Sequence, residues 1–159
     1  LLLKLINLIE KSRLDIQVKA LVGFDFSYKK KLDHILSTYS PNITVKEFNY
    51  EDLFSSKLVI SSFGVTPYEV IYNEIPVLTF GHKSKNALAS EVLHDRYGCN
   101  FNLGLFADIN DSSFVNTVEK FWNSEYLREK MQSSQKGLID GEGLIRTGDL
   151  IYKIYNESW

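Results

Sequence analysis

The 159-residue sequence predicts an α/β fold in which a parallel sheet carries helices on both faces. Short apolar, β-branched runs alternate with helix-length amphipathic segments along most of the chain, as in domains built on parallel sheets. The stretch 57–80 shows the pattern most clearly: a buried strand, a turn of small residues, a helix start and a second strand led by proline. Right-handed connections between the strands follow from this alternation.

Five short runs of apolar or β-branched residues predict the strands: 17–22, 43–48, 58–61, 76–80 and 99–103. Between and after them, amphipathic segments predict the helices: 1–12, 28–38, a short helix that starts at Asn49, 67–73, 84–96, 111–122, 124–135 and 143–156.

Several residues support these bounds. In helix 1–12, one face of the helix carries Leu1, Leu5, Leu8 and Ile9. In helix 28–38 the expected inward residues are Leu32, Ile35 and Leu36. Gly98 is expected to stop helix 84–96. The apolar residues of the last helix predict that it docks on the domain: Leu144, Ile145, Leu150, Ile151 and Ile154.

Composition narrows the function classes. A net charge of −2 gives no reason to expect nucleic acid, and the basic run 29–31 is interpreted as a solvated helix face. The single cysteine, Cys99, excludes an internal disulfide and is expected to be a small buried residue, which fits a cytoplasmic protein. The histidines His34, His82 and His94 lack metal-ligand spacing. We therefore expect no metal and no cofactor.

The turn after strand 58–61 is the main candidate for a binding site. Ser62 and Gly64 leave main-chain N–H groups uncovered at the carboxyl end of a strand and the start of a helix, which suits a phosphate-bearing ligand. Two interpretations compete for Glu69. In the first, Thr66 and Glu69 form a capping box with Pro67 in the first turn. In the second, the Glu69 carboxylate faces the cleft and accepts hydrogen bonds from ribose hydroxyls.

Other residues are expected at the same rim. Gly23 and Phe24 follow the first strand, where glycine permits close backbone approach or simply a tight turn. After the second strand, Phe48 and Asn49 could present main-chain groups to a base, or Asn49 could serve only as a helix cap with Asp52 at the third position.

The segment ITVKEFNYEDLFSSKLVISSFGVTPYEVIYNEIPVLTF resembles the carboxyl-terminal half of GT-B-fold sugar-nucleotide enzymes, with MurG-type glycosyltransferases and the PseG/SpsG group nearest in pattern. The resemblance depends on Gly64, Thr66 and Glu69 in G-x-T-x-x-E spacing, followed by the pair Ile75-Pro76. The tail GLIDGEGLIRTGDLI resembles the ending of the PseG/SpsG group through a further set of residues: Ile139, Asp140, Gly141, Gly143 and Arg146.

This resemblance implies a Rossmann-like, nucleotide-sugar-binding domain over 1–159, a fragment of a longer two-domain enzyme whose catalytic groups lie mostly in an absent amino-terminal domain. It assigns ribose to Glu69, the diphosphate to the turn 62–66 and uracil to the segment 48–49. The full expected nucleotide-binding set is Gly23, Phe24, Phe48, Asn49, Ser62, Gly64, Val65, Thr66, Glu69, His82 and Asn86. The implied partners are a UDP-sugar and that other domain, through which the enzyme would associate peripherally with a membrane.

Three positions depart from the family pattern: Phe63 precedes Gly64 in place of a second glycine, Glu74 replaces glycine with Asn73 expected to supply the left-handed turn, and Asn86-Ala87 replaces Asn-Gln. Asp140 and Arg146 are expected to be structural.

Three functions stay open: a PseG-like UDP-sugar hydrolase of cell-surface glycan or nonulosonic acid synthesis, a MurG-type transferase, and a non-catalytic nucleotide-sugar-binding module.

Overall fold

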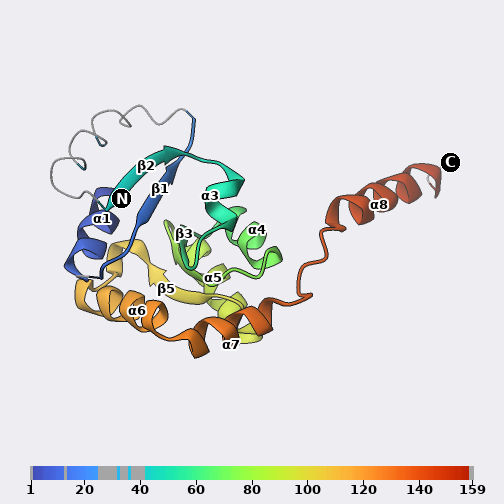
Figure 1. Cartoon of the computed structure of the whole chain (residues 1–159). Coiled ribbons are helices and arrows are strands. Elements are labelled where there is room, and N and C mark those ends of the chain that lie inside the picture. The colour runs from blue at the N-terminus through green and yellow to red at the C-terminus, as the bar shows by residue number, and fades with distance from the viewer. Residues whose placement is uncertain (1, 13, 25–31, 33–35, 37–41, 158–159) are drawn as a thin grey trace.

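The computed structural model describes residues 2–12, 14–24, 32, 36 and 42–157 (Figure 1). Strands and helices alternate as expected, which confirms the α/β class. The elements, in order, are α1 (Leu2–Lys11), β1 (Val18–Val22), β2 (Ile43–Glu47), α3 (Tyr50–Phe54), β3 (Val59–Ser62), α4 (Thr66–Tyr72), β4 (Val77–Gly81), α5 (Ser84–Tyr97), β5 (Phe101–Leu105), a 3-10 helix (Phe106–Asp108), α6 (Asp111–Asn123), α7 (Glu125–Gln135) and α8 (Gly143–Glu157). Of the helix expected at 28–38, only Leu32 and Leu36 are described, and both are buried; Ile35, His34 and the basic run 29–31 lie outside the described residues.

In the part of the chain that the structure describes, all strand pairs are parallel, but the strands form two sheets. One contains β1 and β2, and the other has the order β3-β4-β5. The sequence predicted one sheet, because strand patterns identify strands and not the neighbours with which they pair. Between the two sheets, β1 faces β3 across a cavity of about 750 Å³ whose walls include Ala20, Leu58 and Ile60.

Side-chain packing joins the two sheets. Helix α1 buries Leu8 among residues of β4 and α6, and it buries Ile6 among residues of β1 and β2. The strand β4 is buried along its whole length, with Phe80 in the cluster under α1 and α6 and Val77 in the cluster with α3 and α4. Cys99 is fully buried in that second cluster, as predicted.

The turn between α4 and β4 corrects the expectation for Asn73. Asn73 has φ −90° and donates its side-chain amide to the Glu69 carbonyl at 2.8 Å, while Glu74 takes the left-handed conformation with φ 56°. The N–H of Ile75 donates to the Val70 carbonyl, and the N–H of Glu74 donates to the Ile71 carbonyl. These two bonds make a Schellman motif, in which the residue after the C-cap is left-handed. Glu74 therefore takes a left-handed conformation, which glycine adopts more readily.

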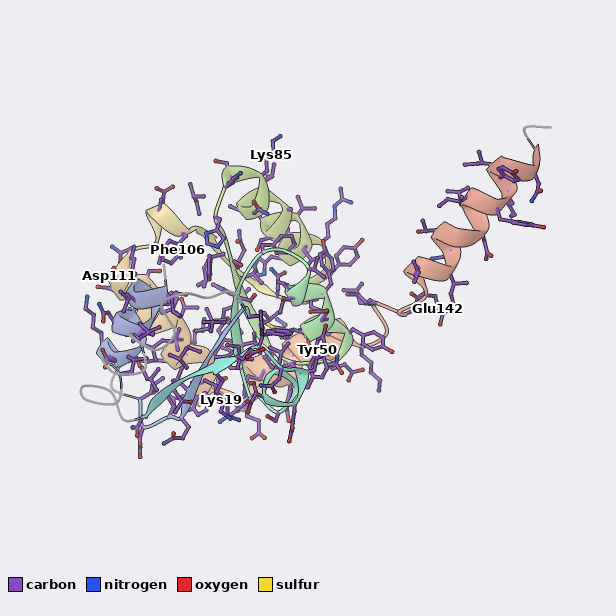
Figure 2. All side chains as sticks on the ribbon, turned by 90° about the horizontal axis from the view of Figure 1, so that it is seen from above. Lys19, Tyr50, Lys85, Phe106, Asp111 and Glu142 are labelled. Atoms are coloured by element: carbon purple, nitrogen blue, oxygen red, sulfur yellow. The ribbon has the colours of Figure 1, made fainter. Side chains whose placement is uncertain are left out.

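The last helix does not dock, which contradicts the prediction. Figures 1 and 2 both show α8 standing apart from the body of the domain, and every described residue from 140 to 156 is exposed. Leu144, for example, is 84% exposed. The chain before it is held locally: Arg146 makes a two-pronged ion pair with Asp140, at 2.6 and 3.1 Å, which is consistent with a structural role for both. An amphipathic pattern predicts that a face will be covered but does not identify what covers it.

Among the described residues, no helix combines the length and the apolar character needed to cross a membrane.

Candidate functional site

The carboxyl ends of β1, β2 and β3 meet at one side of the domain. The cavity between the sheets is lined there by Gly23, Phe48, Ser62 and Thr66, which follow or end these three strands or begin the helix after β3. The structure thus brings together four residues that the sequence assigned to one rim. Phe24, also predicted there, is 86% exposed next to Gly23.

The turn after β3 is fixed to β4 at its first residue and is exposed at the next two. The N–H of Phe63 donates to the Phe80 carbonyl at 2.7 Å, and the Phe63 side chain is buried. By contrast, Gly64 and Val65 are exposed. From the first turn of α5, the Asn86 side-chain amide donates to the Phe63 carbonyl at 3.1 Å. Asn86 therefore lies beside the turn that follows β3.

Gly81 permits this approach of α5. A Cβ atom at Gly81 would lie 2.2 Å from the main-chain nitrogen of Ala87, so only glycine fits between β4 and the first turn of α5. His82 follows Gly81 and is exposed, with its ring edge-on to Phe80 at 5.7 Å between centroids. His94 lies away from the rim, where its Nδ1 hydrogen-bonds the Asn100 carbonyl.

The predicted capping box is absent. Val65, not Thr66, is the N-cap of α4, and no side chain caps this helix. The N–H of Tyr68 donates to the Val65 carbonyl, which starts the helix one residue earlier than the sequence motif implies. Since Thr66 is inside the helix, its hydroxyl is not in the position from which a cap accepts the N–H of Glu69.

Glu69 instead contacts the preceding helix. Its carboxylate oxygen Oε1 accepts a hydrogen bond from the Tyr50 hydroxyl at 3.0 Å, which links α4 to α3. This hydrogen bond and the negative charge of Glu69 raise the pKa of Tyr50 above its ordinary value. The bond also shows that the chain after β2 and the helix after β3 share one rim, so Asn49 and Gly64 do not lie at opposite edges.

Sequence reasoning missed Tyr50. Its ring stacks on Phe54 with centroids 5.3 Å apart and meets the edge of Phe48 at 5.3 Å. These three rings form one cluster, of which Phe48 lines the cavity between the sheets. The spacing of aromatic residues at 48, 50 and 54 around a short helix was the available signal.

Asn49 is the helix cap that the sequence predicted. Its side-chain oxygen accepts the N–H of Asp52 at 2.8 Å, and its amide donates to the Glu47 carbonyl and to Asp52. Asp52 also pairs with Lys19 and Lys46, and together with Asn49 these lysines hold the pKa of the Asp52 carboxyl well below its usual range. The Asn49 side chain is therefore occupied, which leaves main-chain groups and aromatic rings to contact a base.

The described residues contain no group of three or more His, Cys, Asp or Glu side chains placed to hold a metal ion.

Comparison with known proteins supports the fold. No protein-family model matches the chain, and no curated protein matches it by sequence. Among solved structures, the chain is similar to a crystal structure from Listeria monocytogenes of a protein described as a UDP-N-acetylglucosamine 2-epimerase, with a TM-score of 0.54 and 13% identity. The alignment covers 94% of this chain and 48% of that one, so the chain spans about half the length of its structural neighbour. The likeness shows a shared fold, the Rossmann-like half of a GT-B-type architecture.

Proposed function

We propose that this chain is the UDP-sugar-binding half of a GT-B-type enzyme. The observation that carries the proposal is the hydrogen bonding of the Glu69 carboxylate. Its carboxylate has no capping role and accepts a hydrogen bond from Tyr50, which links α4, the helix that follows β3, to α3, the helix that follows β2. A carboxylate in this position can accept hydrogen bonds from both hydroxyls of a ribose.

In this proposal, the diphosphate and the base of the nucleotide contact other residues near Glu69. The exposed turn at Gly64 and Val65 offers main-chain N–H groups to the diphosphate, and Asn86 steadies that turn through the Phe63 carbonyl. The base lies toward Phe48, whose ring borders the cavity. In this arrangement the chain binds the leaving diphosphate and the nucleoside, and stabilises the charge that develops on the diphosphate as the sugar departs.

The resemblance to the PseG/SpsG group favours a hydrolase, in which water attacks the UDP-sugar bond. A MurG-type transferase, in which an acceptor hydroxyl attacks instead, is the alternative. The name of the structural neighbour adds epimerisation of a UDP-sugar as a third chemistry. All three require the same binding role from this half, and in each the catalytic groups belong to the remainder of a longer chain. A non-catalytic nucleotide-sugar-binding module is the rival from another class.

The test is a calorimetric titration of the protein with UDP, UMP and ADP. We expect UDP to bind more tightly than UMP because of the second phosphate, and more tightly than ADP because of the base. Gly64→Ala gives a matched variant for the turn: no atom lies within 4 Å of the added Cβ, so folding is preserved while the approach of a phosphate is obstructed. This variant should weaken UDP binding more than uridine binding.

Arg146→Ala is the control, because Arg146 lies in the exposed segment and pairs with Asp140. It should leave UDP affinity unchanged. Equal affinities of the wild type for UDP, UMP and ADP, or loss of UDP binding in a fully stable Arg146→Ala protein, would contradict this placement of the site.

A further inference from the structure

We infer that Tyr50 is a positioning residue that makes this site selective for ribonucleotides over deoxyribonucleotides. The inference rests on the proposed function, since it concerns how Glu69 is prepared to meet a ribose. Its starting point is the 3.0 Å hydrogen bond from the Tyr50 hydroxyl to Oε1 of Glu69.

Neighbouring rings fix the position of the Tyr50 ring. Tyr50 is the first residue of α3, and its ring packs between the edge of Phe48 and the face of Phe54. Although the residue is 51% exposed, both ring contacts restrict the direction in which the hydroxyl points. That direction is toward α4, where Glu69 lies one turn inside the helix.

The hydrogen bond removes freedom that Glu69 would otherwise have. Glutamate is among the side chains that lose the most rotamer entropy when they are ordered. Tyr50 orders it before any ligand arrives, because one carboxylate oxygen is already bound. The two oxygens of a carboxylate offer about four acceptor directions, so Tyr50 occupies one and leaves the rest for a vicinal diol.

The protonation states of Tyr50 and Glu69 determine which of the two donates the hydrogen bond. The Tyr50 phenol keeps its proton at neutral pH, since its ordinary pKa is 10.0 and the hydrogen bond to Glu69, followed by the negative charge of Glu69, raises that pKa further; the phenol is therefore the donor. Glu69 then acts only as an acceptor, and the hydroxyls of the ligand must donate. A sugar that lacks the 2′-hydroxyl supplies one donor fewer, and the prepared carboxylate discriminates against it.

The experiment compares Kd values for UDP and 2′-deoxy-UDP in the wild type, Tyr50→Phe and Tyr126→Phe. Tyr50→Phe keeps the aromatic ring and deletes the donor. Tyr126 lies on α7 and is 70% exposed, so its variant is a matched control for loss of a phenol. The wild type should prefer UDP by about tenfold, the effect of one hydrogen bond to a charged acceptor. In Tyr50→Phe the preference should fall to about threefold or less, chiefly through weaker UDP binding. Tyr126→Phe should match the wild type.

A thermodynamic cycle with Glu69→Ala, which removes the acceptor of the Tyr50 hydroxyl, distinguishes positioning from a general structural effect. If Tyr50 acts through Glu69, the double variant should bind UDP no more weakly than Glu69→Ala alone. Additive losses would overturn the inference, as would a wild-type preference retained in Tyr50→Phe, and in both cases the proposed UDP site would stand. Equal binding of UDP and 2′-deoxy-UDP by the wild type would overturn the ribose assignment of Glu69 together with the role of Tyr50. Failure of the wild type to bind UDP would overturn the inference and the proposed function together.

Discussion

Replacing Gly81 by alanine should destabilise the domain and loosen the binding turn at the same time. The added Cβ would lie 2.2 Å from the nitrogen, 2.6 Å from the Cα and 2.7 Å from the Cβ of Ala87. Real Cβ atoms do not approach other atoms so closely, so α5 must shift away from β4. Overpacking usually costs about 1–3 kcal/mol. Because the obstruction is helix backbone and not the end of a flexible side chain, we expect about 3 kcal/mol.

For a chain of 159 residues, that cost corresponds to a fall in Tm of roughly 10 °C. The shift of α5 would also stretch the 3.1 Å bond from Asn86 to the Phe63 carbonyl, so UDP affinity should fall in the protein that remains folded. Thermal melting and urea unfolding measure the first effect, and calorimetry below Tm measures the second. Gly148→Ala is the control, since no atom lies within 4 Å of its added Cβ in the exposed helix α8. A Gly81→Ala protein that melts within about 2 °C of the wild type would refute the close approach of α5 to β4.

Three further results are expected. Glu74→Gly should stabilise the domain by about 0.5–1 kcal/mol in urea unfolding, because it relieves a left-handed non-glycine residue at φ 56° and this gain exceeds the added backbone entropy; a destabilised variant would contradict the Schellman turn. Glu69→Gln should lower the pKa of Tyr50 toward its ordinary 10.0, measured by NMR titration of labelled tyrosine, and an unchanged pKa would mean that the two side chains do not meet. Cys99 is fully buried, and burial raises the pKa of its thiol to about 11. It should therefore resist alkylation at pH 8 until the protein is unfolded. Rapid modification of the native protein would contradict its burial.

Features set by local chemistry could be predicted from the sequence. Asn49 caps α3 through the N–H of Asp52, and Gly98 ends α5 with φ 63°, because a short polar side chain and a left-handed residue satisfy helix ends within a few positions of the chain. The strands fall within two residues of their predicted bounds, because short apolar, β-branched runs are also a local signal. Their carboxyl ends meet at one rim, since parallel connections return each strand in the same direction.

Features that depend on distant partners could not be predicted. Thr66 and Glu69 have capping-box spacing, but the start of α4 at Val65 and the hydroxyl of Tyr50 determine what Glu69 does. The gap between β1 and β3 depends on how α1 packs against both sheets. The apolar residues of α8 predicted a buried face, but in the structure residues such as Leu144 and Tyr152 of this helix are exposed.

The central claim is that Glu69 holds the ribose of a UDP-sugar, and calorimetric titration of UDP into wild-type and Glu69→Gln protein tests it most directly. Glutamine keeps the size of the side chain and an oxygen that can accept from Tyr50, and no capping bond is lost, so the stability cost should stay below about 1 kcal/mol. Hydrogen bonds to a charged partner contribute about 1.5–3 kcal/mol each, so UDP affinity should fall on the order of tenfold or more. Unchanged affinity in a well-folded Glu69→Gln protein, or a wild type that does not bind UDP at millimolar concentration, would contradict the claim.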